Sequence, residues 1–191
     1  SSDATLKNEL VTSLNMFDLT GKIAVLTGSS IGMGRALAEG LAMAGAKVVV
    51  SSRKGDVCEE TAAAINELCG EDRAIAIPCN IGHKEQLQNL VDETHRQLGP
   101  IDILVGNAGV NPFYGPSAEI PDSAFEKTLA SNVESNHWLC HMVLPDMIEK
   151  KDGVIVITSS NGAFSPSTVL GAYAISKAAD LALVRNLAAE Y

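Results

Sequence analysis

Five short apolar runs, rich in β-branched residues, recur along the chain from residue 22 onward, and longer amphipathic stretches separate them. Runs as apolar as these are typical of strands that are buried on both faces, as in a parallel sheet covered by helices. Regular alternation of strand and helix with right-handed crossovers gives a doubly wound α/β sandwich. The sequence therefore predicts an α/β domain whose parallel strands lie at 22–28, 46–52, 74–80, 102–109 and 154–160.

The stretches between the apolar runs predict the helices that cover this sheet. Their apolar residues recur at helical spacing, so each stretch presents one face to the sheet and one to solvent. The helices are expected at about 33–44, 55–69, 84–98 and 122–150, with a last helix that begins near Ala172.

The domain is expected to cover residues 21–191 as a single unit, because no linker, internal repeat or low-complexity tract interrupts it. Residues 1–20 form a separate N-terminal extension. Leu6, Leu10 and Leu14 would share one face of a short helix in this extension, and that face would pack on the domain.

Charge and composition exclude several classes of protein. With 14 basic and 23 acidic residues the net charge is −9, which argues against a nucleic-acid or anionic-membrane surface. No run approaches the roughly 18 apolar residues of a membrane span, and the start of the chain lacks a signal-peptide core. The cysteines form no CxxC pair, so we expect reduced thiols in a cytoplasmic protein. They are Cys58, Cys69, Cys79 and Cys140.

A glycine-rich loop, TGSSIGMG, joins the first predicted strand to the first predicted helix through Gly28, Gly32 and Gly34. Such a loop needs glycine for a tight turn and for close approach of a pyrophosphate to the amides of a helix N-terminus. The spacing is G-x-x-x-G-x-G rather than the general G-x-G-x-x-G. A simple turn is the alternative. The position between strand and helix favours a dinucleotide site in a Rossmann-type fold.

The end of the second predicted strand, VVVSSRKG, bears on the choice of nicotinamide cofactor. NAD-binding folds carry an Asp or Glu here for the ribose 2′-hydroxyl, whereas a nearby Arg accommodates the 2′-phosphate of NADP. No carboxylate follows until Asp56, while Ser51, Ser52, Arg53 and Lys54 offer donors and positive charge. A solvated basic turn is the alternative. The sequence favours NADP over NAD.

Tyr173 and Lys177 are four residues apart on the last predicted helix, so their side chains share one face. A free tyrosine titrates near pH 10, and an adjacent ammonium stabilises its phenolate. Such a pair can protonate a carbonyl oxygen during reduction or deprotonate an alcohol during oxidation. Taken alone, the spacing is common and would indicate a surface pair.

Three more motifs accompany the glycine loop TGSSIGMG (27–34) and the YAISK pair (173–177): GNAG (106–109), Asn132 in LASNVES, and Ser160 after the fifth predicted strand. With these five motifs the chain resembles the short-chain dehydrogenase/reductase family over residues 22–191. The motifs occur in the family's order and on the expected elements. Two further stretches, VNPF and VVVSSRK, resemble the carbonyl-reductase branch, which acts on ketones, dicarbonyls or retinoids.

The resemblance implies catalytic roles. Tyr173 would be the general acid/base, and Ser160 would hydrogen-bond the substrate oxygen. Lys177 would also hold the nicotinamide ribose, and Asn132 would position a water in a proton relay behind it. Ser159 competes for the serine role, but on strand alternation its side chain points away from that of Ser160.

The resemblance also implies a cofactor site, with Thr27 supporting the glycine loop. Gly106 departs from the family's NNAG motif, and Asn80 stands where an Asp usually lies near the adenine; its amide can still bond the adenine amino group. The expected cofactor-binding residues are Gly28, Ser30, Ile31, Gly32, Gly34, Ser52, Arg53, Lys54, Asn80, Ile81, Asn107, Ala108, Gly109, Tyr173 and Lys177.

Two other features have less specific interpretations. His137 and His141 lie one helical turn apart beside Cys140, but no third metal ligand is apparent, so helix packing is favoured and no metal is expected. The segment VNPFYGPS (110–117) would either line the substrate side of the pocket or brace a loop.

We therefore expect an NADP(H)-dependent carbonyl reductase acting on a small-molecule carbonyl or alcohol, with the cofactor carrying the hydride. The family resemblance implies a homodimer or homotetramer formed through the helices at 122–150 and 172–190. The chain ends at Tyr191, before the strand, lid helix and edge strand that the family adds, so we expect the physical protein to continue. The alternative is a non-catalytic dinucleotide-binding or interaction protein. An epimerase is less favoured, because those relatives use TGxxGxxG.

Overall fold

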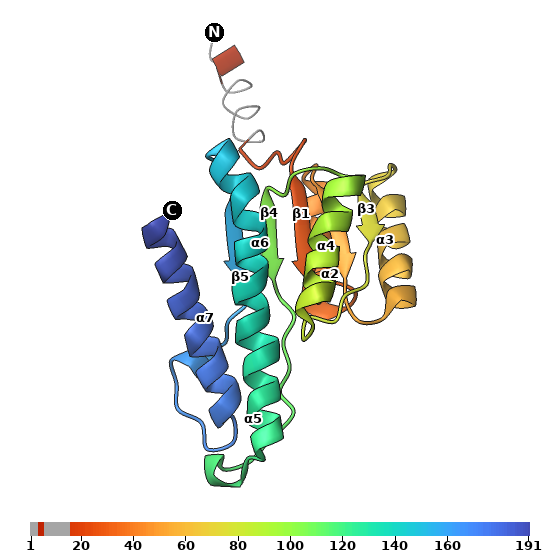
Figure 1. The fold of residues 1–191 in the computed structure, drawn as a ribbon. Coiled ribbons are helices and arrows are strands. Elements are labelled where there is room, and N and C mark those ends of the chain that lie inside the picture. The colour runs from red at the N-terminus through yellow and green to blue at the C-terminus, as the bar shows by residue number, and fades with distance from the viewer. Residues whose placement is uncertain (1–3, 6–15) are drawn as a thin grey trace.

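A five-stranded parallel sheet with the order β3-β2-β1-β4-β5 forms the centre of the domain (Figure 1). The computed structural model describes residues 4–5 and 16–191, so the predicted helix with Leu6, Leu10 and Leu14 lies outside the described residues. The predicted doubly wound α/β fold is confirmed. The strands are β1 (Ile23–Thr27), β2 (Lys47–Ser51), β3 (Ala74–Ala76), β4 (Ile103–Gly106) and β5 (Val154–Ile157).

Every strand is shorter than the apolar run that predicted it, chiefly at its C-terminal end. The parallel pairing of β3 with β2 stops at Ala76, and that of β5 with β4 stops at Ile157. Residues 77–80, 107–109 and 158–160 are loops instead. These loops carry predicted site residues, as expected where ligands bind beyond the carboxyl ends of parallel strands.

Helices cover both faces of the sheet, and the helical region expected at 122–150 contains a π-helical turn that was not expected. The region is helical from residue 122 to residue 150, and within it the π-helical turn η2 (Ala130–Glu134) lies between α5 (Asp122–Leu129) and α6 (Ser135–Lys150). The remaining helices are α2 (Gly32–Met43), α3 (Gly55–Cys69), α4 (Lys84–Gln97) and α7 (Gly171–Glu190), with short 3-10 turns η1 (Ser117–Glu119) and η3 (Asn161–Ala163).

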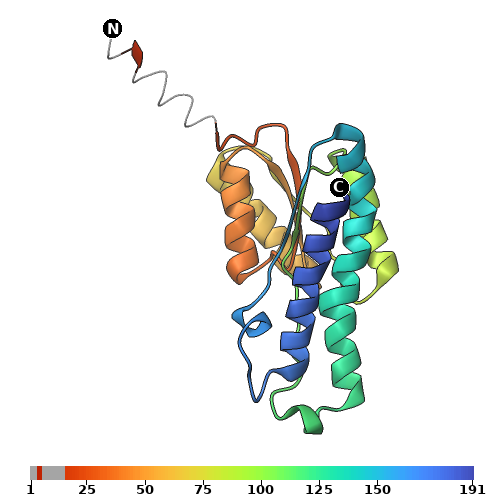
Figure 2. The ribbon, with the colours of Figure 1, turned by 90° about the vertical axis from the view of Figure 1, so that its left-hand side faces the viewer.

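Alternation along the buried strands assigns each helix to one face of the sheet. Val25 and Leu104 belong to the cluster beneath α4 and α6, whereas Leu26 and Val105 belong to the cluster beneath α2 and α3. Helix α7 lies on the α6 side, as Figure 2 shows. Each central strand is therefore buried on both faces, which explains its nearly continuous apolar sequence.

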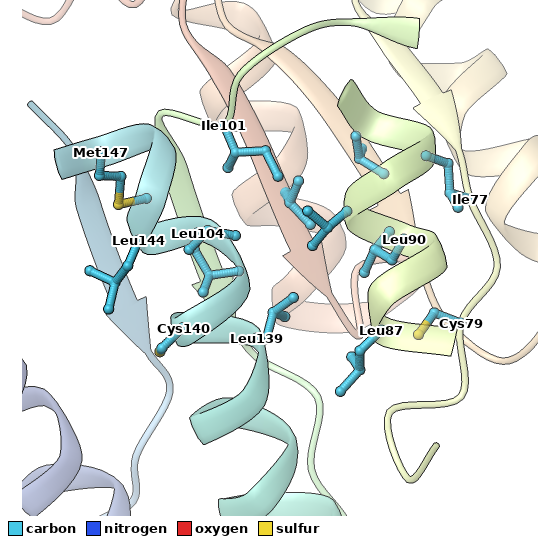
Figure 3. Close-up of a cluster of buried hydrophobic side chains, with 14 of the residues drawn as sticks. Ile77, Cys79, Leu87, Leu90, Ile101, Leu104, Leu139, Cys140, Leu144 and Met147 are labelled. Atoms are coloured by element: carbon cyan, nitrogen blue, oxygen red, sulfur yellow. The ribbon is translucent and has the colours of Figure 1, made fainter. Parts of the chain in front are cut away.

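The larger core cluster fills the space between the sheet and helices α4 and α6 (Figure 3). Full burial of a leucine or isoleucine contributes roughly 1.5–3 kcal/mol, so this cluster stabilises the positions of both helices. The side chains of this cluster include Ile77, Leu87, Leu90, Ile101, Leu104, Leu139, Leu144 and Met147.

Within the part of the chain that the structure describes, no helix is both long and apolar enough to span a bilayer.

Two cysteines belong to this cluster and behave as small apolar side chains. Burial raises the pKa of Cys79 to about 11. Burial, with a smaller contribution from the charge of Asp180, raises the pKa of Cys140 to about 12. All four cysteines are free thiols, in line with the absence of CxxC pairs.

Candidate active site

The glycine loop forms the turn from β1 into α2. Gly28 and Gly32 have φ values of +63° and +58°, in the left-handed region that side chains with a Cβ rarely adopt. Gly34 is required for a different reason, since a Cβ there would overlap the carbonyl oxygen of Gly28 and lie 2.6 Å from Asn107 Nδ2. The loop therefore packs closely against the residues that follow β4 at Gly28 and Gly34, where a side chain would not fit.

Hydrogen bonds join this loop to the ends of β4 and β5. Thr27 Oγ1 accepts from the backbone N–H groups of Asn107 and Ala108, each at 3.1 Å. Asn107 Nδ2 donates to Gly28 O at 3.0 Å, and Asn107 Oδ1 accepts from Thr158 Oγ1 at 3.0 Å. Asn107 thus connects the ends of β1, β4 and β5, and the Thr27 hydroxyl bonds the backbone that follows β4.

A cavity of about 380 Å³ opens beside the glycine loop, where the strand order reverses between β1 and its neighbours β2 and β4. This crevice is the usual place for a ligand in an open α/β sheet. Ten of the predicted cofactor residues line it together. They are Gly28, Ser30, Ile31, Ser52, Arg53, Lys54, Ile81, Asn107, Ala108 and Gly109, with Val57, Cys79 and Val110 completing the wall.

The basic end of the cavity lies after β2. Ser30 Oγ donates to Ser52 Oγ at 2.8 Å, which links the glycine loop to this segment. Arg53 and Lys54 are exposed and form no ion pair with another described residue. An uncompensated pair of cations at the rim suits an anionic group such as a phosphate.

The other predicted cofactor residues do not line the cavity. Gly32 and Gly34 belong to the glycine loop and determine its backbone, but they do not line the cavity. Asn80 Oδ1 accepts from Gly82 N at 3.1 Å, so the side chain is hydrogen-bonded within its own turn. The backbone N–H of Asn80 donates to Gln86 Oε1 at 2.8 Å. Tyr173 and Lys177 lie beyond the cavity, on α7.

A second cavity, of about 750 Å³, lies elsewhere, between α6, α7 and the exposed side of β5. It is larger, but none of the predicted site residues lines it. The smaller cavity is the better candidate for the ligand site, because the glycine loop, the basic rim and the strand crossover meet there.

Lys177 is almost completely buried, with 3% of its surface exposed. Its Nζ donates to Thr158 O at 2.8 Å and lies 5.7 Å from the centroid of the Tyr173 ring. Burial lowers the pKa of Lys177, and the carboxylate of Asp180 opposes that effect. The predicted neighbours on α7 are therefore in contact, with the ammonium held between the helix and the end of β5.

Asn132 lies in the π-helical turn η2 and is fully buried. Its Oδ1 accepts from Val110 N at 2.7 Å, and its Nδ2 donates to Val110 O at 2.9 Å and to Ser176 Oγ at 3.0 Å. The side chain thus ties the cavity loop to α7. π-Helical turns often occur at functional sites, and here the turn accompanies the residue that makes these bonds.

The two serines after β5 have different partners. Ser159 Oγ donates to Lys177 O at 3.2 Å, which commits it to the backbone of α7. Ser160 Oγ accepts from Gly162 N at 3.1 Å, so its own hydrogen can be donated to a ligand. A Cβ on Gly162 would lie 3.4 Å from Ser160 Oγ and 3.8 Å from Ala174 Cβ, which puts Ser160 near the first turn of α7.

Three buried polar residues of this region were not predicted from the sequence, namely Ser176, Asn136 and Asp180. Ser176 Oγ donates to Tyr173 O at 2.7 Å while accepting from Asn132. Asp180 follows Lys177 by one helical turn, so a carboxylate at that spacing was the available signal. Asn136 could be recognised only once η2 and α6 were placed against α7.

The remaining sequence features give no further site. The rings of His137 and His141 pack together with centroids 4.3 Å apart. Among the described residues, no group of three or more His, Cys, Asp or Glu side chains is arranged to hold a metal ion. The segment 110–117 pairs with the loop before α7 through a bridge between Gly115 and Leu170.

Comparison with known proteins shows which family the chain matches and which proteins are similar to it. The short chain dehydrogenase family matches residues 22–191. "Dehydrogenase/reductase SDR family member 4" of Bos taurus is 40% identical over 173 residues, which are 90% of this chain and 61% of the relative. The chain therefore spans less than two thirds of the length of that relative.

Two solved structures with bound cofactors are similar in fold. A 7α-hydroxysteroid dehydrogenase complexed with NADH and 7-oxo glycochenodeoxycholic acid has a TM-score of 0.86 at 36% identity, over 91% of this chain and 67% of that one. A gluconate 5-dehydrogenase from Burkholderia cenocepacia, with NADP and tartrate, has a TM-score of 0.87 at 27% identity, over 94% and 69%. The family match, the relatives and the fold agree: this chain belongs to the short-chain dehydrogenase/reductase family.

Proposed function

We propose that the protein is an NADP(H)-dependent oxidoreductase that transfers hydride between the cofactor and a carbonyl or alcohol substrate. The observation that carries the proposal is the place of Gly109. This residue lines the cavity, and a Cβ on it would lie 3.3 Å from Asn132 Oδ1 and 3.4 Å from Lys177 Nζ. Asn132 and Lys177 therefore adjoin the part of the cavity that Gly109 lines, while Arg53 and Lys54 line it after β2.

The residues of the cavity fit a nicotinamide dinucleotide. The glycine loop leaves space and backbone amides at the start of α2 for a pyrophosphate, while Ser52, Arg53 and Lys54 would receive the adenosine end. When bound, the cofactor would supply or accept the hydride. Solved relatives with NADH and with NADP both occur, so the preference for NADP rests on this chain's basic rim.

The side chains on α7 and after β5 would handle the proton and orient the substrate. Tyr173 would donate a proton to a carbonyl oxygen during reduction, or remove one from an alcohol during oxidation. Ser160 would donate a hydrogen bond to the same oxygen. The ammonium of Lys177 would favour the phenolate form of the tyrosine through its positive charge.

Two exposed aromatic side chains support a substrate with apolar surface. Tyr114 and Phe164 are 72% and 71% exposed, on the two loops that Gly115 and Leu170 join before α7. Exposed aromatic groups around a polar centre are typical of sites for small organic ligands. Ketones and dicarbonyls are the substrate class that we propose.

The test combines binding and turnover with the purified protein. NADPH fluorescence should report binding, and a panel of ketones and dicarbonyls should give substrate-dependent NADPH oxidation. Binding without turnover on any member of the panel would favour the alternative, a non-catalytic dinucleotide-binding protein. Absence of both would contradict the proposal altogether.

We predict that Arg53→Ala weakens NADPH binding by about 10-fold or more and leaves NADH binding nearly unchanged. A hydrogen bond to a charged group contributes roughly 1.5–3 kcal/mol, and only NADPH carries the 2′-phosphate. Isothermal titration of both cofactors measures the difference. Lys47→Ala is the matched control, since Lys47 is an exposed cation at the opposite end of β2. Equal weakening of both cofactors would show that Arg53 does not recognise the phosphate.

The subunit arrangement follows from the same proposal. We propose a homodimer or homotetramer formed through α6 and α7, where Ile148 and Ile175 are about half exposed, at 50% and 53%. Exposed apolar side chains on neighbouring helices are common in subunit interfaces. A cytoplasmic location remains a prediction.

A further inference from the structure

Asp180 is a buried carboxylate that the proposed reaction has not used. Only 1% of its surface is exposed, and it lies one turn after Lys177 on α7. Its Oδ1 accepts from Asn136 Nδ2 at 3.1 Å. Its Oδ2 has no hydrogen-bond partner among the described residues and lies 3.9 Å from Lys177 Nζ.

Asn136, on the neighbouring helix α6, hydrogen-bonds this carboxylate, and the absence of a side chain at Gly106 leaves space for Asn136. Asn136 Nδ2 donates both to Asp180 Oδ1 and, at 2.9 Å, to Asn132 O in the π-helical turn. A Cβ at position 106 would lie 2.5 Å from Asn136 Oδ1. The glycine that departs from the family's NNAG motif is thus matched to a side chain 30 residues further along the chain.

The electrostatic surroundings make Asp180 the main partner of the Lys177 charge. Among the described residues, it is the only carboxylate within 4 Å of Lys177 Nζ. The other groups around the ammonium are Thr158 O and the Tyr173 ring. The thiol of Cys140 on α6 faces the other member of the pair, since the charge of Asp180 acts on it. The thiol's pKa is about 12, so it is neutral at physiological pH.

Burial acts against both members of this pair. It lowers the pKa of Lys177 and raises the pKa of Asp180. The hydrogen bond from Asn136 and the charge of Lys177 counteract the effect on Asp180, while Asp180 counteracts the effect on Lys177. A buried ion pair is weak evidence for stability, so its presence beside the reacting residues calls for another explanation.

We propose that Asp180 is a positioning residue for the reaction, which keeps Lys177 in its charged form beside Tyr173 and is itself held by Asn136 in the space left by Gly106. The inference rests on the proposed function, because the charge of Lys177 matters there for the proton transfer by Tyr173. Asp180 does not touch the substrate and acts through Lys177.

The test is Asp180→Asn, which keeps the shape and an oxygen for Asn136 but removes the charge. Loss of the carboxylate removes an interaction that favours the ammonium, so the pKa of Lys177 should fall further. An opposite charge at this distance shifts a pKa by about one to three units. In cofactor-free protein labelled with 13Cε-lysine, the Lys177 signal, assigned with Lys177→Met, should titrate at a pH lower by at least about one unit. The high-pH limb of the kcat/KM profile should move in the same direction.

Asp102→Asn is the matched control, because Asp102 is also buried, at 5% exposed, and pairs with Lys150 at 2.7 Å away from the site. It should leave the Lys177 titration unchanged. An unchanged Lys177 midpoint in Asp180→Asn would overturn the proposal even if activity fell. If that variant does not fold, 13Cγ-aspartate spectra of the unmodified protein decide, since a protonated Asp180 at pH 7 would equally overturn it. These titrations need no turnover, so they stay informative if the proposed function fails.

Discussion

Replacement of Tyr173 by phenylalanine should reduce kcat by about 10²–10⁴-fold, the usual contribution of a general acid or base. Phenylalanine keeps the ring near Lys177 Nζ, which lies 5.7 Å from the ring centroid, and removes only the hydroxyl. No hydrogen bond joins that hydroxyl to another described residue, so folding stability should change little. Steady-state turnover with NADPH and the best carbonyl substrate is the measurement.

Cofactor binding separates a chemical role of Tyr173 from a structural one. Loss of one hydrogen bond costs about 0.5–1.5 kcal/mol, so the Kd for NADPH should rise by about 10-fold at most. Tyr191→Phe is the control, because Tyr191 is 66% exposed and follows the last residue of α7; the activity of this variant should match that of the unmodified protein. Activity of Tyr173→Phe within a factor of three of the parent would rule out the proposed acid/base role.

The order of the elements could be predicted from the sequence because burial determines it. A run such as KIAVLTG, which would have apolar side chains on both faces of a strand, is typical of a sheet that helices cover on both sides, and the structure has such a sheet. The strand ends were overestimated, because apolar residues continue after pairing stops. Ile77 is buried in the core although β3 ends at Ala76.

The candidate site was predictable only where a local motif exists. The glycine loop and the pair of Tyr173 and Lys177 have fixed spacings, so a single sequence contains them. The π-helical turn η2 has no such local signal, because it occurs where Asn132 bonds Val110, 22 residues earlier in the chain. The contact between Asn136 and Asp180 likewise joins residues 44 apart, and it depends on how α6 and α7 pack.

The second large effect is expected for Gly34→Ala. The new Cβ would overlap Gly28 O and approach Asn107 Nδ2, which are a backbone carbonyl and a side chain already bonded to that carbonyl. Neither can move without displacing the end of β1 or β4. Overpacking of this kind should lower the free energy of unfolding by about 3 kcal/mol. Because a misplaced glycine loop no longer matches a pyrophosphate, NADPH binding should weaken by about 100-fold.

Gly40→Ala is the matched control for this prediction, because it places the same methyl group in the same helix with nothing within 4 Å. Alanine is favoured over glycine inside a helix by about 0.5–1 kcal/mol, so this variant should be slightly more stable and should bind NADPH normally. Urea unfolding and cofactor titration of both variants measure the two effects. If Gly34→Ala were as stable as Gly40→Ala and bound NADPH equally well, the close packing of the loop against Asn107 would be excluded as the reason for glycine at position 34.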